Sequence, residues 1–101
     1  MSKIYQPKLV TFRYQDEPGK KVFVAGSFNN WDPKANPLND KCQTGDYSAM
    51  LLIPAGRHEY RFVVDGSWRF DRDNPLIAVN RDGGPNSVLM VEEIDSCRIS
   101  I

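Results

Sequence analysis

Hydrophobic and polar side chains alternate at a period of two along much of the chain, which indicates β-strands rather than helices. In the segment 9–14, for example, Val10, Phe12 and Tyr14 share one face. Seven Gly and seven Pro residues interrupt the chain at short intervals, and no window of twelve residues keeps an apolar stripe at the helical period. Short strands between turn signals predict an all-β antiparallel sandwich. The predicted strands are 9–14, 20–25, 47–53, 58–65 and 86–92.

The dipeptide Asp65-Gly66 stands between two β-type segments and predicts a two-residue hairpin with a type I′ turn. That turn places Val63 opposite Trp68. Residues two apart on a strand share a face, so Arg61 lies on the same side of the hairpin as these two. We assign the other side to the core, with Tyr60, Phe62 and Val64. The same register would point Arg69 toward the core and Phe70 outward, so we expect the regular pairing to end soon after Trp68.

The chain has 101 residues, which is typical of a single domain, and we expect one domain over 1–101 with its core at about 8–92. Lys plus Arg and Asp plus Glu are 13 each, so the net charge is zero. A neutral chain is a poor partner for nucleic acid or for an anionic membrane. No apolar run approaches the length of a membrane span. The first residues lack the apolar region of a signal peptide, and we expect a cytoplasmic location.

Few residues in the chain could support metal binding or catalysis. Cys42 and Cys97 are the two cysteines, and without an export signal we expect them to stay as thiols. A single histidine argues against a histidine metal site or a catalytic triad. Asp71 and Asp73 lack the full loop of oxygen ligands that calcium needs, so we predict no metal and no cofactor. Glycoside hydrolysis needs two carboxylates across a cleft, which a small neutral sandwich does not suggest, so we predict no enzyme activity.

Two tryptophans are the strongest candidates for a binding surface. Trp31 follows the second predicted strand in a polar loop, and Trp68 stands just after the hairpin turn. Taken alone, Trp31 could equally plug one end of the sandwich. Two tryptophans beyond strand ends favour an exposed aromatic pair, which suits sugars because a pyranose ring offers a flat C–H face. Aromatic contacts add about 0.5–1.5 kcal/mol each, so a polymer must be held at several units.

The segments 23–31 and 54–68, followed by Asp71, Asn74-Pro75 and Asn86, carry a family resemblance over nearly the whole chain. They resemble the family 48 carbohydrate-binding modules, and among them the glycogen-binding domains of AMP-activated protein kinase β subunits. The resemblance implies an immunoglobulin-like (early-set) β-sandwich. It also implies binding of α-1,4-linked glucan, such as glycogen, starch or maltodextrin, without catalysis.

The resemblance also implies four carbohydrate-binding residues. Trp31 and Trp68 match the tryptophans that stack on glucose rings. Arg61 matches a basic residue that hydrogen-bonds sugar hydroxyls and is more often lysine in the kinase subunits. Asn86 matches an asparagine that contacts sugar. The stretch 80–85 is about one residue longer than its counterpart and lacks the family's leucine and threonine, which argues against tight binding of cyclic or single-turn glucans.

Two other functions fit the same sequence. The tryptophans could meet a partner protein, which would make the chain a protein-interaction domain on the same fold. The chain could also be an accessory domain from a glycogen- or starch-active enzyme, because similar modules precede catalytic barrels. Retention on amylose resin or glycogen separates sugar binding from protein interaction.

Overall fold

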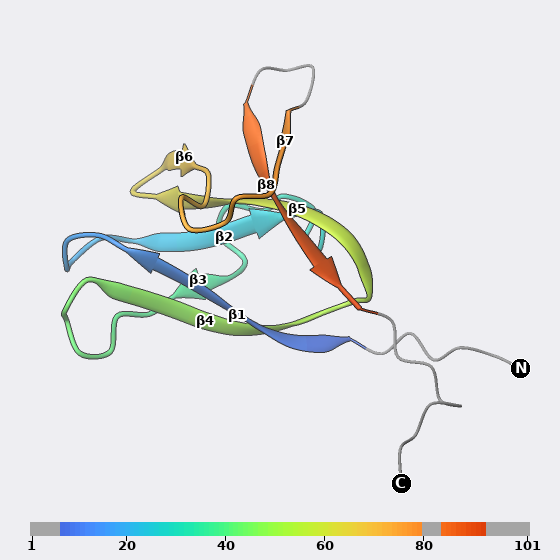
Figure 1. Ribbon diagram of the computed structural model, residues 1–101. Helices are drawn as coiled ribbons and strands as arrows, with labels where there is room; N and C mark the ends of the chain where they lie inside the picture. The colour runs from blue at the N-terminus through green and yellow to red at the C-terminus, as the bar shows by residue number, and fades with distance from the viewer. Residues whose placement is uncertain (1–6, 80–83, 93–101) are drawn as a thin grey trace, which may run out of the picture.

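Residues 7–79 and 84–92 are described by a computed structural model, and all regular elements among them are β-strands (Figure 1). No helix in these ranges is long and apolar enough to cross a membrane. The strands are β1 (Lys8–Gln15), β2 (Val22–Gly26), β3 (Pro37–Leu38), β4 (Asp46–Ile53), β5 (Gly56–Val64), β6 (Ser67–Arg69), β7 (Ile77–Val79) and β8 (Pro85–Val91).

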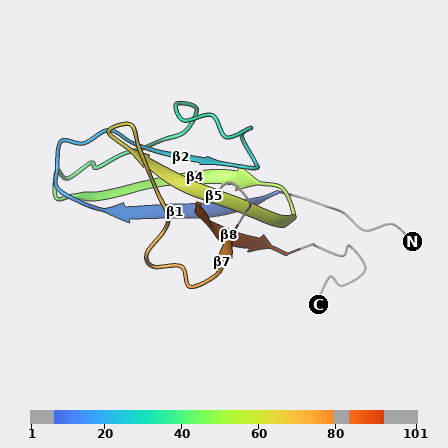
Figure 2. The same ribbon diagram turned by 90° about the horizontal axis from the view of Figure 1, so that it is seen from above.

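The strands form two antiparallel sheets. One is the pair β1–β4, with Lys8 opposite Ile53 and Gln15 opposite Asp46. The other has the order β3-β2-β5-β8-β7, with β6 also paired to β5. The β1–β4 pair lies below β2 and β5 in Figure 1, and Figure 2 shows the strands of both layers running in similar directions. The predicted all-β sandwich is therefore confirmed, while its immunoglobulin-like assignment and the single-domain boundaries stay predictions.

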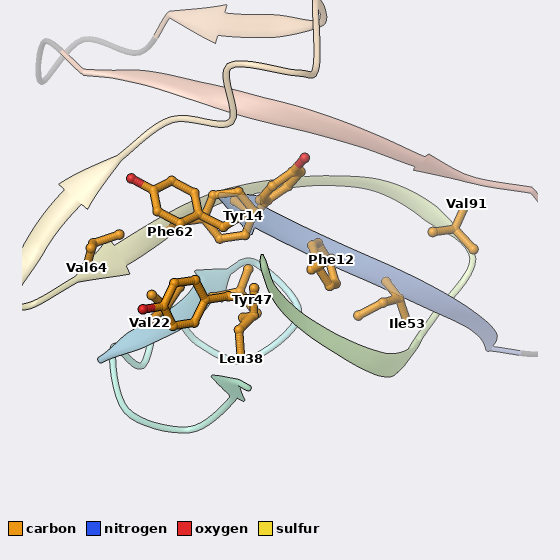
Figure 3. Packing of buried hydrophobic residues seen from close by; sticks show 11 residues of the cluster. Phe12, Tyr14, Val22, Leu38, Tyr47, Ile53, Phe62, Val64 and Val91 are labelled. Carbon is orange, nitrogen blue, oxygen red and sulfur yellow. The ribbon is translucent and has the colours of Figure 1, made fainter. Parts of the chain in front are cut away.

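The hydrophobic core fills the space between the two layers, with side chains of both sheets pointing toward each other (Figure 3). Phe62 of β5 is fully buried. Aromatic rings join the layers, since the ring centroids of Phe12 and Tyr60 are 5.2 Å apart and those of Tyr14 and Phe62 are 5.1 Å apart. Each such pair adds about 0.5–1.5 kcal/mol beyond the area it buries. The core side predicted for the hairpin is confirmed in Tyr60, Phe62 and Val64, and the described core also includes Phe12, Tyr14, Val22, Val24, Tyr47 and Ile53.

The hairpin after β5 forms as its sequence predicts. Asp65 and Gly66 both have positive φ, at 48° and 84°, which a type I′ turn requires. Val63 lies opposite Trp68, and β6 ends one residue later at Arg69. Val63 is only 4% exposed although it lies on the face away from the core. The outer face of this hairpin is therefore covered at Val63 rather than open to water.

A group of partly buried hydrogen bonds ties the segment after β6 to β5 and β8. The Tyr60 hydroxyl donates to Asp71 Oδ2 at 2.6 Å, and Asn74 Nδ2 donates to the Tyr60 oxygen at 3.1 Å and to the Val88 carbonyl at 2.8 Å. The Asp71 amide donates to Ser87 Oγ at 2.8 Å. Burial, together with the Asp71 carboxylate, raises the pKa of Tyr60. These contacts fix the stretch 70–74 against the sheet.

Parts of the sequence predictions fall outside the described residues. Cys42 is exposed in the segment between β3 and β4, and Cys97 lies beyond the described ranges, so the expectation of free thiols stays a prediction. The atypical stretch 80–85 is described only at Gly84 and Pro85.

Candidate functional site

The loop that carries Trp31 begins at the end of β2 in a tightly packed turn. A side chain at Gly26 would overlap the Glu59 carbonyl, so the close approach of β5 requires glycine there. The Asn29 side chain fills the turn: its Oδ1 accepts from the Gly26 amide at 2.9 Å, and its Nδ2 donates to the Val24 carbonyl at 3.0 Å. The Trp31 amide donates back to the Gly26 carbonyl at 2.9 Å.

Trp31 is held in an unusual backbone conformation. Its φ is 56°, and that of Asn30 is 57°. A left-handed conformation costs a residue other than glycine roughly 1–2 kcal/mol. Such strain in a bulky residue persists only where the surroundings hold it, and it is common at functional sites. The hydrogen-bonded turn supplies that restraint and so fixes the direction of the half-buried indole.

Trp31, in the loop after β2, and Trp68, on β6, form an aromatic pair on the surface. Their ring centroids are 6.5 Å apart and the ring planes are inclined by 44°. Trp68 is 42% exposed. The two rings are not stacked on each other, and the inclination leaves them as two platforms set at an angle.

The four residues proposed from the sequence meet in one surface pocket. A pocket of about 280 Å³ is lined by Trp31, Arg61, Trp68 and Asn86. Arg61 comes from β5 and Asn86 from β8, which pairs with β5. The structure thus brings together two aromatic platforms and two polar groups, while their role as sugar ligands stays a prediction.

A chain of hydrogen bonds starts at Arg61 and Asn86, the polar residues that line this pocket, and continues to Glu59 and Arg57. Arg61 Nε donates to Asn86 Oδ1 at 2.6 Å, and Asn86 Nδ2 donates to Glu59 Oε1 at 2.9 Å. Arg57 Nη1 donates to Glu59 Oε2 at 2.7 Å. The hydrogen bond from Asn86 and the one from Arg57 hold the pKa of Glu59 below its usual value. Asn86 is 4% exposed and hydrogen-bonds both Arg61 and Glu59. It therefore orients Arg61 in addition to lining the pocket.

Similarity to known proteins identifies the family of this chain. The family model described as the glycogen recognition site of AMP-activated protein kinase matches residues 8–97. The chain belongs to this glycogen-recognition family. It is 38% identical over 79 residues to the mouse 5'-AMP-activated protein kinase subunit beta-2, covering 78% of this chain and 28% of that protein. It is 36% identical over 77 residues to rat subunit beta-1, covering 76% and 27%. The chain therefore spans less than a third of these relatives.

In this member of the glycogen-recognition family, the guanidinium of Arg61 lies over Gly84. A Cβ at position 84 would overlap the guanidinium nitrogens and Cζ of Arg61. Because glycine has no side chain, position 84 leaves room for the guanidinium of Arg61. Neither Gly84 nor Glu59 was among the predicted site residues. Alternation of the charged residues Arg57, Glu59 and Arg61 along β5 was the sequence signal that could have drawn attention to Glu59.

Proposed function

We propose that this chain binds α-1,4-linked glucan (glycogen, starch chains or maltodextrins) without hydrolysing it. The observation that carries the proposal is the convergence of Trp31, Trp68, Arg61 and Asn86 on one pocket. Membership of the glycogen-recognition family supports the same ligand class.

The pocket offers both kinds of contact that a sugar chain needs. The apolar C–H face of a glucose unit packs on an indole, and the 44° inclination between Trp31 and Trp68 suits a chain that bends from one unit to the next. Arg61 uses Nε to bind Asn86 and retains Nη1 and Nη2 as donors for sugar hydroxyls. Hydrogen bonds of this kind contribute about 0.5–1.5 kcal/mol each, and up to roughly 3 kcal/mol when a charged group takes part.

The proposal is for binding without catalysis. Hydrolysis of a glycosidic bond needs two carboxyl groups on either side of it. Among the described residues, those that line the tryptophan pocket are aromatic, basic or amide, and the nearby Glu59 carboxylate is engaged by Asn86 and Arg57. The proposed role is therefore to attach a larger cytoplasmic protein or complex to glucan, in line with the relatives, which are kinase subunits.

Titration with maltoheptaose, followed by tryptophan fluorescence, tests this function. The chain has two tryptophans, and both line the pocket, so a bound sugar should change the emission in a saturable way. Cello-oligosaccharides of similar length should give no such change, because their β-1,4 linkage produces a straight rather than a curved chain. An equal response to both sugars would remove the α-1,4 specificity. Lack of response to either, with no retention on glycogen, would favour the protein-interaction alternative.

A further inference from the structure

A second pocket adjoins the tryptophan pocket and shares part of its wall. It has a volume of about 370 Å³, and Arg61 and Trp68 line both pockets. A ligand seated on the tryptophans can therefore extend past these two residues without leaving the surface. The other described residues that line the second pocket are Tyr14, Arg69, Phe70, Arg72 and Pro85.

The second pocket has an excess of positive charge. Its described lining includes Arg61, Arg69 and Arg72, and no carboxylate. Arg72 also borders a neighbouring pocket that contains Asp71 and Asp73, so part of its charge is offset there. Arg61 and Arg69 line the second pocket and do not line that neighbouring pocket. In a chain whose net charge is zero, this local excess marks the second pocket as a site for an anionic group.

An aromatic ring lies beside these cations. Phe70 is 40% exposed and stands two residues after Trp68. Its position follows from the end of β6 at Arg69 and from the hydrogen bonds that anchor Asp71 to Tyr60 and Ser87. An exposed ring next to guanidinium groups suits a sugar that carries a negative charge, since the ring supports the pyranose face and the arginines meet the charge.

We propose that this second pocket accepts a phosphate monoester carried on the glucan chain. The inference rests on the proposed glucan binding and deepens it, because the glucose units on the tryptophans would direct the esterified unit toward Phe70 and Arg69. A phosphate monoester carries a charge of about −1.5 to −2 near neutral pH and offers three acceptor oxygens. The planar guanidinium matches such oxygens with two parallel donors.

Paired ligands that differ only in phosphate test the proposal. Affinity is measured for a phosphorylated malto-oligosaccharide fraction and for the same fraction after treatment with a phosphatase. Exposed ion pairs are worth a factor of about 1.5 to 5 each, so two arginines predict roughly two- to twenty-fivefold tighter binding of the phosphorylated form. The preference should shrink in high salt, because exposed charges are then screened. Inorganic phosphate, added as a competitor, should reduce the preference without displacing the dephosphorylated glucan.

Matched variants localise the effect. The double change Arg69→Gln and Arg72→Gln should abolish the preference for phosphate and leave binding of dephosphorylated glucan within about twofold of the parent. Lys41→Gln removes one positive charge from an exposed residue outside the pocket and should keep the preference. Arg69→Lys retains the charge and should retain part of the preference, which separates the pocket's charge from damage to the fold.

The outcomes separate the two proposals. Equal affinity for both glucan forms would overturn the phosphate pocket while glucan binding stands. A phosphate preference that persists in the double variant would also overturn it, because the charge would then be met elsewhere. Failure of both forms to bind would overturn glucan binding and the phosphate pocket together.

Discussion

Replacement of Trp68 by alanine removes one of the two platforms of the tryptophan pocket. Trp68 lies opposite Val63 in the β5–β6 hairpin, and its ring centroid is 6.5 Å from that of Trp31. If the pair holds consecutive parts of a glucan chain, the variant should lose affinity for maltoheptaose while its core, which lies on the other face of β5, stays intact.

The cost in folding stability follows from the exposure of the side chain. Tryptophan buries about 150–250 Å² when fully covered. At 42% exposure, roughly three fifths of Trp68 is covered. With about 25 cal/mol per Å² of apolar area, burial of about 90–145 Å² corresponds to roughly 2–4 kcal/mol. This is an upper bound, because the unfolded chain already buries part of that area. We therefore expect a loss of about 1–3 kcal/mol, which a domain with a stability of about 5–15 kcal/mol survives.

The same change should weaken glucan binding measurably. An aromatic contact contributes about 0.5–1.5 kcal/mol to the binding free energy, in addition to the contribution from the apolar area that it buries on the sugar face. A loss of 1.4 kcal/mol is tenfold, so Trp68→Ala should weaken maltoheptaose binding by about tenfold or more. The assay is isothermal titration with each variant, alongside its denaturant midpoint. Leu52→Ala, which truncates a 66% exposed side chain on β4, is the control and should bind like the parent.

Two results would refute this reasoning. If Trp68→Ala is unfolded in the absence of denaturant, the side chain belongs to the core and not to a ligand platform. If it is folded and binds maltoheptaose like Leu52→Ala, the glucan is held elsewhere. Trp68→Phe keeps a ring and should retain part of the affinity, which distinguishes loss of the platform from loss of the hairpin.

Three further predictions follow from the pocket and the thiols. Gly84→Ala should displace the Arg61 guanidinium and weaken glucan binding about as much as Arg61→Ala, with little change in the denaturant midpoint; unchanged affinity would show that the guanidinium position is unimportant. The pKa of Glu59 is lowered on folding, so its ionised form stabilises the fold above its ordinary pKa of 4.5, and this contribution disappears as the pH falls through the lower folded value. The free energies of unfolding of the parent and of Glu59→Gln should therefore differ at pH 7 and converge in acid. A difference that does not change with pH would contradict the coupling between ionisation of Glu59 and stability. Thermal unfolding should be the same with and without reductant if Cys42 and Cys97 are not obligatorily paired, and a lower midpoint in reductant would show a disulfide.

The strands that the sequence predicted are those long enough to show alternation. β1, β2, β4, β5 and β8 have five to nine residues each and were all predicted, and the core side of β5 could be assigned in advance. β3 and β7 have two and three residues, so no period is visible in them, and pairing with neighbours defines them. The hairpin register was predictable because the turn chemistry of Asp65-Gly66 is local.

The residues of the site likewise fall into those that could be predicted from the sequence and those that could not. Trp31, Trp68, Arg61 and Asn86 could be proposed because a family resemblance placed them, and the hairpin register gave Trp68 and Arg61 a common face. The roles of Glu59 and Gly84 could not be predicted, because each depends on a contact with a residue more than 20 positions away. Glu59 accepts a hydrogen bond from Asn86, 27 positions away, and Gly84, just before β8, lies against Arg61 of β5.

The register of β5 links the stability of the fold to the geometry of the site. Its even-numbered positions from Tyr60 to Val64 fill the core, while its odd-numbered positions include the charged residues Arg57, Glu59 and Arg61, of which Arg61 lines the pocket. A slip of one residue would bury these charges and expose the core aromatics, since the side-chain period is two. The close contact of Gly26 with β5 and the positive-φ turn at Asp65-Gly66 both oppose such a slip. Hydrophobic burial along one face of β5 therefore also sets the position of Arg61 relative to the two tryptophans.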